Sequence, residues 1–168
     1  IFRSYEEKSL GIDNVMDGIR LKYRPTAGLT IKSFFGTQRF FFEQGPGIVR
    51  GIDAELNLNE SFKGLNNSKT NILLGAGFIS RFQESSNPVY NLPENVGAYS
   101  VRSTINRGKI SFNSEYAYKY NDPDGGVTYN NYAPGNAIMS NMSYSERGLG
   151  IIVEAHRVDN MDFRSARG

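Results

Sequence analysis

The chain of 168 residues is 39% hydrophobic, 12% aromatic and 21% charged, and its formal charge is only +2, which suits a single folded domain spanning residues 1–168. This composition is too apolar for a disordered chain, and its near-neutral balance gives no support for nucleic-acid binding. The chain has no Cys, which excludes disulfides and cysteine nucleophiles, and no apolar run approaches the roughly 18 to 20 residues of a membrane-spanning helix. The opening residues Ile1–Tyr5 resemble the middle of a strand, so we expect a mature or excised chain.

Apolar and polar residues alternate with a period of two through most of the chain, which is typical of strands with one apolar face. The clearest run is Gly51 to Asn59, in which every even position is apolar and every odd position is polar or Gly. The pattern predicts strands at residues 1–8, 15–24, 29–42, 48–61, 70–82, 95–106, 109–120, 136–145 and 148–158. We therefore predict an all-β fold, an antiparallel up-and-down meander of about eight to nine strands.

Short and long connectors alternate between the predicted strands. The short connectors are Pro25–Gly28, Arg107–Gly108 and Glu146–Arg147, with a somewhat longer one at Phe62–Lys69. The long connectors are Glu43–Gly47, Gln83–Glu94 and Asn121–Gly135. Alternate connectors of an antiparallel meander lie at opposite ends of the sheet, and outer-membrane barrels have short periplasmic turns and longer external loops. We therefore expect the short connectors to be periplasmic.

The alternation alone does not show whether the apolar face points inward or outward. A soluble barrel has its apolar residues inside and a membrane barrel has them outside, but both produce the same alternation in the sequence. Aromatic rings near strand ends favour the membrane barrel, whose apolar band is flanked by aromatic girdles. Such rings are Tyr23 and Phe62 beside short connectors, and Phe40–Phe42, Tyr116, Tyr118 and Tyr120 toward the long ones. The sequence thus favours a transmembrane β-barrel, or a section of a larger one.

A family resemblance is carried by Arg3–Asn14 and Asp17–Arg20, by Gly47–Asp53 and by Arg157–Ser165. These segments are similar to those of a family of uncharacterised outer-membrane β-barrel proteins from Bacteroidota, known as a domain of unknown function, and the similarity covers nearly the whole chain. The resemblance implies a bacterial outer-membrane location and a larger barrel, with no known active site and no cofactor. An odd count of nine strands and the final residues Arg164–Gly168, which lack an aromatic, agree with a section of a barrel.

Charged residues on the polar faces of the predicted strands are the candidate binding residues. They either line a solute path through the barrel or pair with one another inside a plugged lumen, and we favour packing over transport. The candidates are Arg20, Lys22, Lys32, Asp53, Glu55, Arg102, Glu115 and Glu154.

The only histidine, His156, would have to serve any histidine-based catalysis, with Glu154 and Asp159 nearby in sequence and Ser145 across the last hairpin. Envelope lipid hydrolases use such groups. However, Glu154 and His156 share the polar phase of the last predicted strand, where neither residue needs a catalytic explanation. We expect a structural role and no enzymatic activity.

Three further motifs have simpler readings. The run Asn121–Gly126 lacks the ligand spacing and closing Glu of a calcium loop, so a solvated turn is favoured. The glycines Gly75 and Gly77 lack the following helix of a phosphate loop, and we expect a bend or a covering aromatic ring. Arg50 breaks the phase of its strand, which a bulge or a contact with lipid phosphate would explain.

These patterns lead to an outer-membrane, porin-like β-barrel with a structural, channel or envelope-scaffold role. We expect outer-membrane lipid and other envelope proteins as partners, and no nucleic acid, metal or cofactor. Two alternatives are kept: a soluble all-β module that binds lipid or carbohydrate, and a barrel-borne lipid hydrolase that uses His156.

Overall fold

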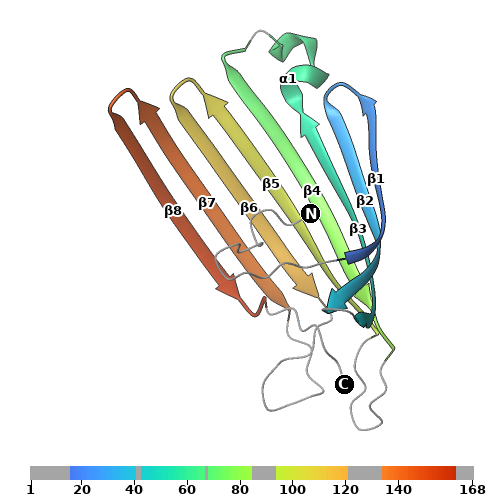
Figure 1. The fold of residues 1–168 in the computed structure, drawn as a ribbon. Helices are drawn as coiled ribbons and strands as arrows, with labels where there is room; N and C mark the ends of the chain where they lie inside the picture. The colour runs from blue at the N-terminus through green and yellow to red at the C-terminus, as the bar shows by residue number, and fades with distance from the viewer. Residues whose placement is uncertain (1–15, 41–42, 67, 85–93, 121–133, 162–168) are drawn as a thin grey trace.

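A computed structural model describes residues 16–40, 43–66, 68–84, 94–120 and 134–161. These residues form a single antiparallel sheet of eight strands in chain order, which confirms the predicted all-β meander (Figure 1). The strands are β1 (Met16–Thr26), β2 (Leu29–Phe40), β3 (Glu43–Asn57), β4 (Thr70–Phe82), β5 (Asn95–Arg107), β6 (Ile110–Tyr120), β7 (Gly135–Glu146) and β8 (Leu149–Asp159). A short helix α1 (Leu58–Ser61) and a 3-10 turn η2 (Lys63–Leu65) lie between β3 and β4. Among the described residues, no helix has the length and apolarity needed to cross a membrane.

Seven strands lie within two residues of their predicted bounds, and β3 is the exception. The predicted connector Glu43–Gly47 is wrong, because β3 already begins at Glu43 and Glu43 pairs with Phe40. The register of β2 against β3 shifts between Thr37 and Arg39, so the Gly-Pro-rich stretch is absorbed as a bulge. The predicted strand 1–8 and most of the connectors Gln83–Glu94 and Asn121–Gly135 lie outside the described residues.

The far end of β3 also differs from the prediction, since Leu58–Ser61 turns into α1. The Asn57 side chain caps this turn by accepting the backbone N–H of Asn59 at 3.1 Å. The Asn59 side chain then donates to the Thr70 carbonyl at 2.7 Å and accepts from the Ile72 N–H at 2.9 Å. These contacts attach the connector to the start of β4.

Three hairpins at the same end of the sheet as α1 have two-residue turns (Figure 1). Gly108 and Gly148 occupy the left-handed region in two of them, with φ of 58° and 82°, where a residue with a side chain would be strained. This is the end at which the sequence places its short connectors, and we call it the turn end.

The two faces of the sheet have opposite chemistry. Direct pairing across strands places Lys22, Lys32, Asp53, Gly77 and Ser100 in one row on the same face, which we call the polar face. The residues that alternate with this row form the apolar face. Its exposed large side chains occur on all eight strands and include Ile19, Leu21, Tyr23, Phe35, Ile52, Leu74, Val101, Ile110, Tyr116, Ile138, Met142, Ile151 and Val153.

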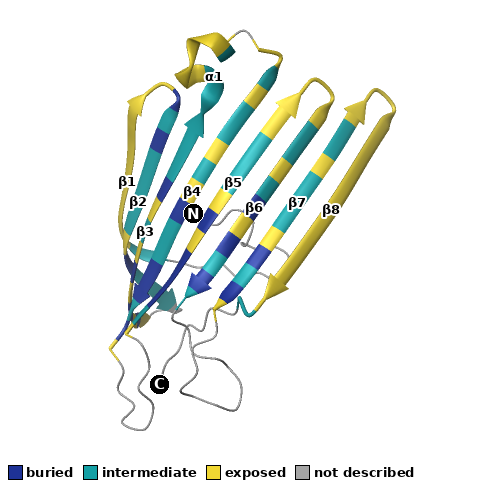
Figure 2. Ribbon diagram, turned by 180° about the vertical axis from the view of Figure 1, so that it is seen from behind, coloured by how far each residue is buried: buried dark blue, intermediate teal, exposed yellow. Residues whose placement is uncertain are grey.

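Burial is inverted relative to a water-soluble protein. On the apolar face, Ile19 is 77% exposed and Leu21 is 62% exposed. On the polar face, Asp53 is 3%, Glu115 5% and Lys119 1% exposed, although ionisable residues are rarely buried in soluble proteins. The sheet is curved, so that β1–β3 stand edge-on where β4–β8 are seen face-on (Figure 1), and the buried positions form a band across it (Figure 2).

Candidate functional site

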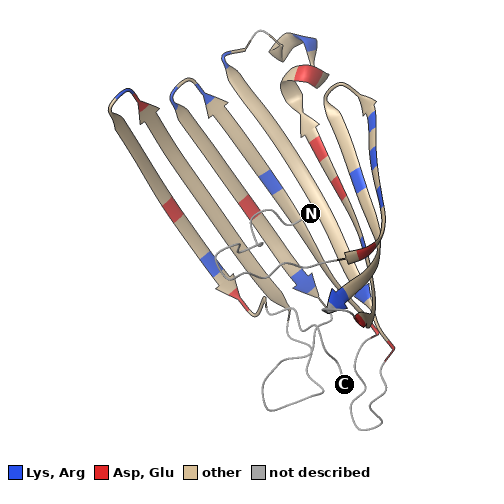
Figure 3. Ribbon diagram, in the orientation of Figure 1, with Lys and Arg blue, Asp and Glu red and all other residues tan. Residues whose placement is uncertain are grey.

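All eight charged candidates lie on the polar face. The strands pair without a register shift through the middle of the sheet, so alternate residues of every strand from β1 to β8 share one face. Direct cross-strand neighbours are Lys22 with Lys32, Lys32 with Asp53, and Arg102 with Glu115. Figure 3 shows the basic and acidic positions distributed along these strands. The candidates do not all meet: Arg20 and Lys22 lie on the edge strand β1, and Glu154 lies on β8.

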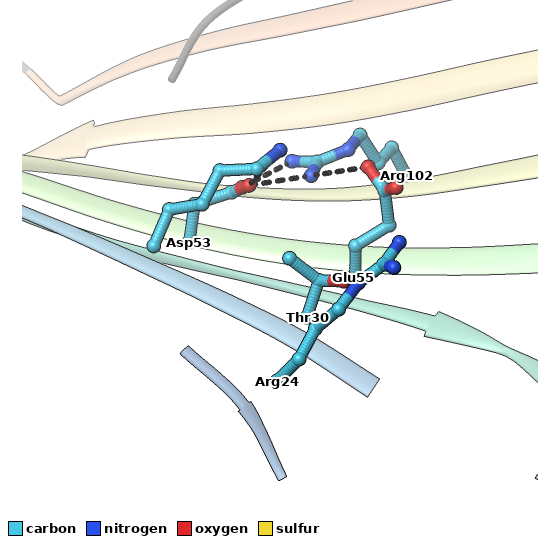
Figure 4. Close-up of polar contacts among 6 residues, drawn as sticks. Arg24, Thr30, Asp53, Glu55 and Arg102 are labelled. Carbon is cyan, nitrogen blue, oxygen red and sulfur yellow. Dashed lines mark hydrogen bonds and ion pairs between the residues drawn. The ribbon is translucent and has the colours of Figure 1, made fainter. Parts of the chain in front are cut away.

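The centre of the site is an ion-pair cluster around Arg102 (Figure 4). The guanidinium of Arg102 donates to both carboxylate oxygens of Asp53, with Nη1–Oδ1 at 2.6 Å and Nη2–Oδ2 at 2.9 Å. Its Nη2 also lies 3.6 Å from Glu55 Oε2, and Lys32 Nζ lies 3.9 Å from Asp53 Oδ2. The Asp53 side chain is almost fully buried, so this bidentate pair supplies the hydrogen bonds that a buried carboxylate requires.

Two glycines of β4 make this pairing possible. Arg102 is on β5 and Asp53 is on β3, so the arginine side chain has to cross β4. A Cβ atom built on Gly75 would lie 2.5 Å from Arg102 Nε, and one on Gly77 would lie 3.2 Å from Asp53 Oδ1. Strand glycines often mark such a close approach to the backbone, but the group that lies over Gly75 is the Arg102 side chain rather than the expected aromatic ring.

An aromatic ring does cover a different glycine. A Cβ on Gly97 would meet the ring and the hydroxyl of Tyr120. The neighbouring Tyr99 and Tyr118 rings are in tilted contact, with centroids 5.3 Å apart and an interplanar angle of 36°. These tyrosines lie toward the end of the sheet opposite the turn end, on the apolar face.

A row of three basic residues lies on the polar face of β1. Arg20, Lys22 and Arg24 are all exposed, and Arg24 Nε donates to Thr30 Oγ1 at 3.1 Å (Figure 4). Within the described part of the chain, none of the three is in an ion pair. We call these three residues the β1 basic row.

The hydrolase-like set around His156 is not brought together. His156 lies opposite Met139, whereas Ser145 lies opposite Gly150, six residues away along β8, which is roughly 20 Å in an extended strand. Asp159 is on the opposite face from His156 because the two are three positions apart in one strand. Glu154 accepts a hydrogen bond from Asn141 Nδ2 at 2.7 Å.

Arg50 is not at a bulge, so the first of the two explanations expected for it is wrong. The pairing of β3 with β2 and β4 is continuous through Arg50, which lies on the apolar face between Phe35 and Ser80. Its Nε donates to Ser80 Oγ at 2.9 Å, and this hydrogen bond partly satisfies the guanidinium among apolar neighbours.

Several charged contacts escaped the sequence reasoning. Arg39 Nε lies 3.4 Å from Asp17 Oδ2. At the turn end, Lys109 donates to Glu146, which lowers the pKa of this exposed carboxyl; a second hydrogen bond from the Tyr144 hydroxyl acts in the same direction. The first contact joins β1 to β2, and the Lys109–Glu146 contact joins the β5–β6 turn to the end of β7, so only the strand pairing could have revealed them. In the described ranges, no three His, Asp or Glu side chains gather as a metal site would require, and the run Asn121–Gly126 lies outside these ranges.

Comparison with known proteins identifies a family without assigning an activity. A family model described as "Family of unknown function (DUF6029)" matches residues 1–168. No curated protein and no solved structure matches the chain. The match over the whole chain agrees with the uncharacterised family expected from the sequence.

Proposed function

The chain belongs to the DUF6029 family of unknown function, and from its geometry we propose that it is a section of a bacterial outer-membrane β-barrel, of the Bacteroidota type that the sequence resembles. Its role is that of an envelope wall, channel or scaffold, and it requires no cofactor. The observation that carries the proposal is the inverted burial of the sheet, with apolar side chains exposed and charged side chains buried.

The exposed apolar face is far larger than scattered surface residues would produce. It contains large apolar side chains on every one of the eight strands, most of them about half exposed. Since full burial of such a side chain is worth about 1.5 to 3 kcal/mol, each forgoes roughly half of that transfer free energy when it stays in water. A contiguous apolar surface on this scale marks a membrane or partner interface. Lipid contact stabilises this face without any further protein.

Strand length and ring placement support the same reading. The strands contain 11 to 15 residues, which suffices for the roughly 9 to 11 residues that a tilted strand needs to cross the apolar layer. Tyr23 and Phe62 are exposed near the turn end, while Tyr116 and Tyr99 are exposed on the apolar face nearer the opposite end. Rings toward both ends of the strands are expected at the two membrane interfaces.

The unpaired edges support a section of a barrel. Among the described strands, β1 pairs only with β2 and β8 pairs only with β7. In the apolar layer every backbone N–H and C=O must be hydrogen-bonded, so spanning sheets close on themselves. Further strands, from this protein or a partner, would complete the wall beside β1 and β8.

The strands are also staggered as barrel closure requires. The row of paired residues that starts at Lys22 ends at Val158. Lys22 lies four residues from the turn end of β1, whereas Val158 lies nine residues from the turn end of β8. The strands are therefore displaced along their own direction from β1 to β8. This displacement is the shear that accompanies tilted strands in a barrel.

The alternatives require features that the described sheet lacks. A soluble binding module needs its apolar face covered, yet this face is the exposed one. A hydrolase built on His156 needs Ser145 nearby, and the two lie toward opposite ends of the last hairpin.

Solubility in detergent and in plain buffer tests the proposal directly. The purified chain should aggregate in plain buffer, fold in detergent micelles or phospholipid vesicles, and migrate differently on gels before and after heating. A chain that is monodisperse and folded in buffer without detergent contradicts the membrane proposal.

A further inference from the structure

The β1 basic row has a regular geometry. Its residues Arg20, Lys22 and Arg24 occupy alternate positions of one strand, so they share the polar face. Successive side chains are roughly 7 Å apart and the row is about 13 Å long, from the rise of an extended strand. All three residues are exposed, and Figure 3 shows them as successive basic positions along β1.

Folding of the sheet alone does not favour this row. Lys22 lies directly opposite Lys32 on β2, and like charges in this arrangement destabilise a sheet. The nearest acidic groups on the same face, Asp53 and Glu55, are directed at Arg102, and Asp53 also lies near Lys32. The carboxylates of β3 therefore pair with Arg102 and Lys32, and the positive charges of the β1 basic row are available to another partner.

The charge balance of the polar face leads to the same conclusion. In the described strands this face carries seven basic and five acidic residues. The basic residues are Arg20, Lys22, Arg24, Lys32, Arg81, Arg102 and Lys119, and the acidic ones are Glu43, Asp53, Glu55, Glu115 and Glu154. The face therefore has an excess of two positive charges, so its acidic residues do not neutralise all of its basic residues.

We propose that the β1 basic row binds anionic solutes that carry two or more phosphate, sulfate or carboxylate groups. Arginine guanidinium groups donate two parallel hydrogen bonds to such oxyanions, and the lysine between them adds a compact positive charge. Three cationic side chains in line allow a multivalent anion to contact two or three of them at once. The inference rests on the proposed function, because a water-filled lumen is what leaves the row accessible to solute.

The binding test uses the trisulfonated dye pyranine and protein folded in non-ionic detergent, with fluorescence anisotropy as the readout. The row variant R20Q/K22Q/R24Q is compared with the control K63Q/R107Q/R147Q, which removes the same charge from exposed positions at the turn end. We expect the row variant to bind about tenfold more weakly or worse, since each exposed ion pair contributes a factor of roughly 1.5 to 5. The control should change affinity less than twofold, and added NaCl should weaken wild-type binding. Equal losses in both variants, or no binding by the wild type, would overturn the proposal.

A single substitution separates solute binding from a structural role. Lys22→Gln removes the like-charge pair with Lys32, so it should raise the urea midpoint of unfolding while it weakens pyranine binding two- to threefold. If an acidic residue of a further strand instead pairs with Lys22, the same substitution lowers the urea midpoint and leaves dye binding unchanged. That second result refutes the anion site even if the triple variant fails to fold.

Failure of the inference is distinguishable from failure of the proposed function. Dependence on detergent and the gel shift on heating report on the barrel and do not involve the dye. If both indicate a barrel while the row variant binds pyranine like the wild type, only the anion site is wrong. If the protein is folded in plain buffer, the barrel proposal fails, and the same titration in buffer then decides whether the row binds anions.

Discussion

Placing an arginine on the apolar face at mid-strand should sharply reduce folding into lipid. Val101 is the central residue of β5, six positions from either end, and is 52% exposed on the apolar face. If this face contacts lipid, Val101→Arg puts a guanidinium near the bilayer midplane at a cost of about 2 to 4 kcal/mol. If the face is merely exposed to water, the same substitution should change stability by no more than about 0.5 kcal/mol.

Matched controls lie on the opposite face of the same strands. Thr104→Arg introduces the same group on the polar face of β5, where Arg102 is already present, and it should be mild. On β7 the adjacent pair Met142→Arg and Asn141→Arg repeats the comparison, with Asn141 beside Glu154 on the polar face.

Depth should modulate the effect on the apolar face. Leu56 and Phe112 lie one and two residues from the turn end of their strands. For Leu56→Arg and Phe112→Arg, the loss of folding free energy in lipid should therefore fall toward about 0 to 1 kcal/mol, the value near the interface. Asn57→Arg and Asn113→Arg, on the polar face, should be mild. Urea titration of folding into phospholipid vesicles, read by circular dichroism and the heat-dependent gel shift, gives these free energies. Equal costs on the two faces at mid-strand would refute the assignment of the apolar face to lipid.

Three further predictions follow from the site and the turns. Arg102→Ala should lower the free energy of unfolding in urea by about 2 to 3 kcal/mol, because the buried Asp53 then keeps only the more distant Lys32 as a partner. Gly75→Ala should destabilise the wild type but be tolerated in the Arg102→Ala variant. Additive effects of the two substitutions would argue against the crossing of β4 by Arg102. His156→Ala should leave folding and any envelope phenotype unchanged, and the loss of a lipase activity in a folded variant would contradict this. Single cysteines at Arg147 and Asp124 should label differently with an impermeant thiol reagent on whole cells, with Asp124 reactive and Arg147 protected if the short turns are periplasmic; the reverse pattern would invert the topology. Arg147 is preferred to Gly108 because Gly108 has a φ of 58°, which a cysteine would strain.

The features that the sequence predicted well are those set by local chemistry. Strand β4 begins and ends at the predicted residues 70 and 82, because its alternation is bounded by turn-forming residues on both sides. The start of β3 was missed because Gly45–Gly47 has the composition of a loop, although the register shift opposite Thr37–Arg39 accommodates Pro46 within the strand. The end of β3 was missed because alternation continues into Leu58–Ser61, where the Asn57 cap decides the conformation.

The candidate site was only half accessible to sequence reasoning. Alternation was sufficient to assign the charged residues to one face, since a strand has only two faces. The partners of Arg102 were not predictable, because Asp53 is 49 residues away in sequence and a whole strand separates the two. The Gly75–Gly77 pair was the available signal: two glycines in a strand indicate that something lies over the backbone, but only the register shows that it is Arg102.

The buried cluster and the exposed apolar face have a common explanation in the proposed barrel, and each is costly without it. In a water-soluble sheet, Asp53 and Glu115 would carry a desolvation penalty while Ile19 and Leu21 remained in water. In a barrel wall, lipid covers the apolar side chains, and the ions pair on the lumen side near water. Because Arg102 and Lys32 together balance Asp53 and Glu55 of β3, the charge that a solute would encounter beside this cluster is that of the β1 basic row. In the proposed barrel, the cluster would therefore stabilise the wall, and the row would give the lumen a preference for anions.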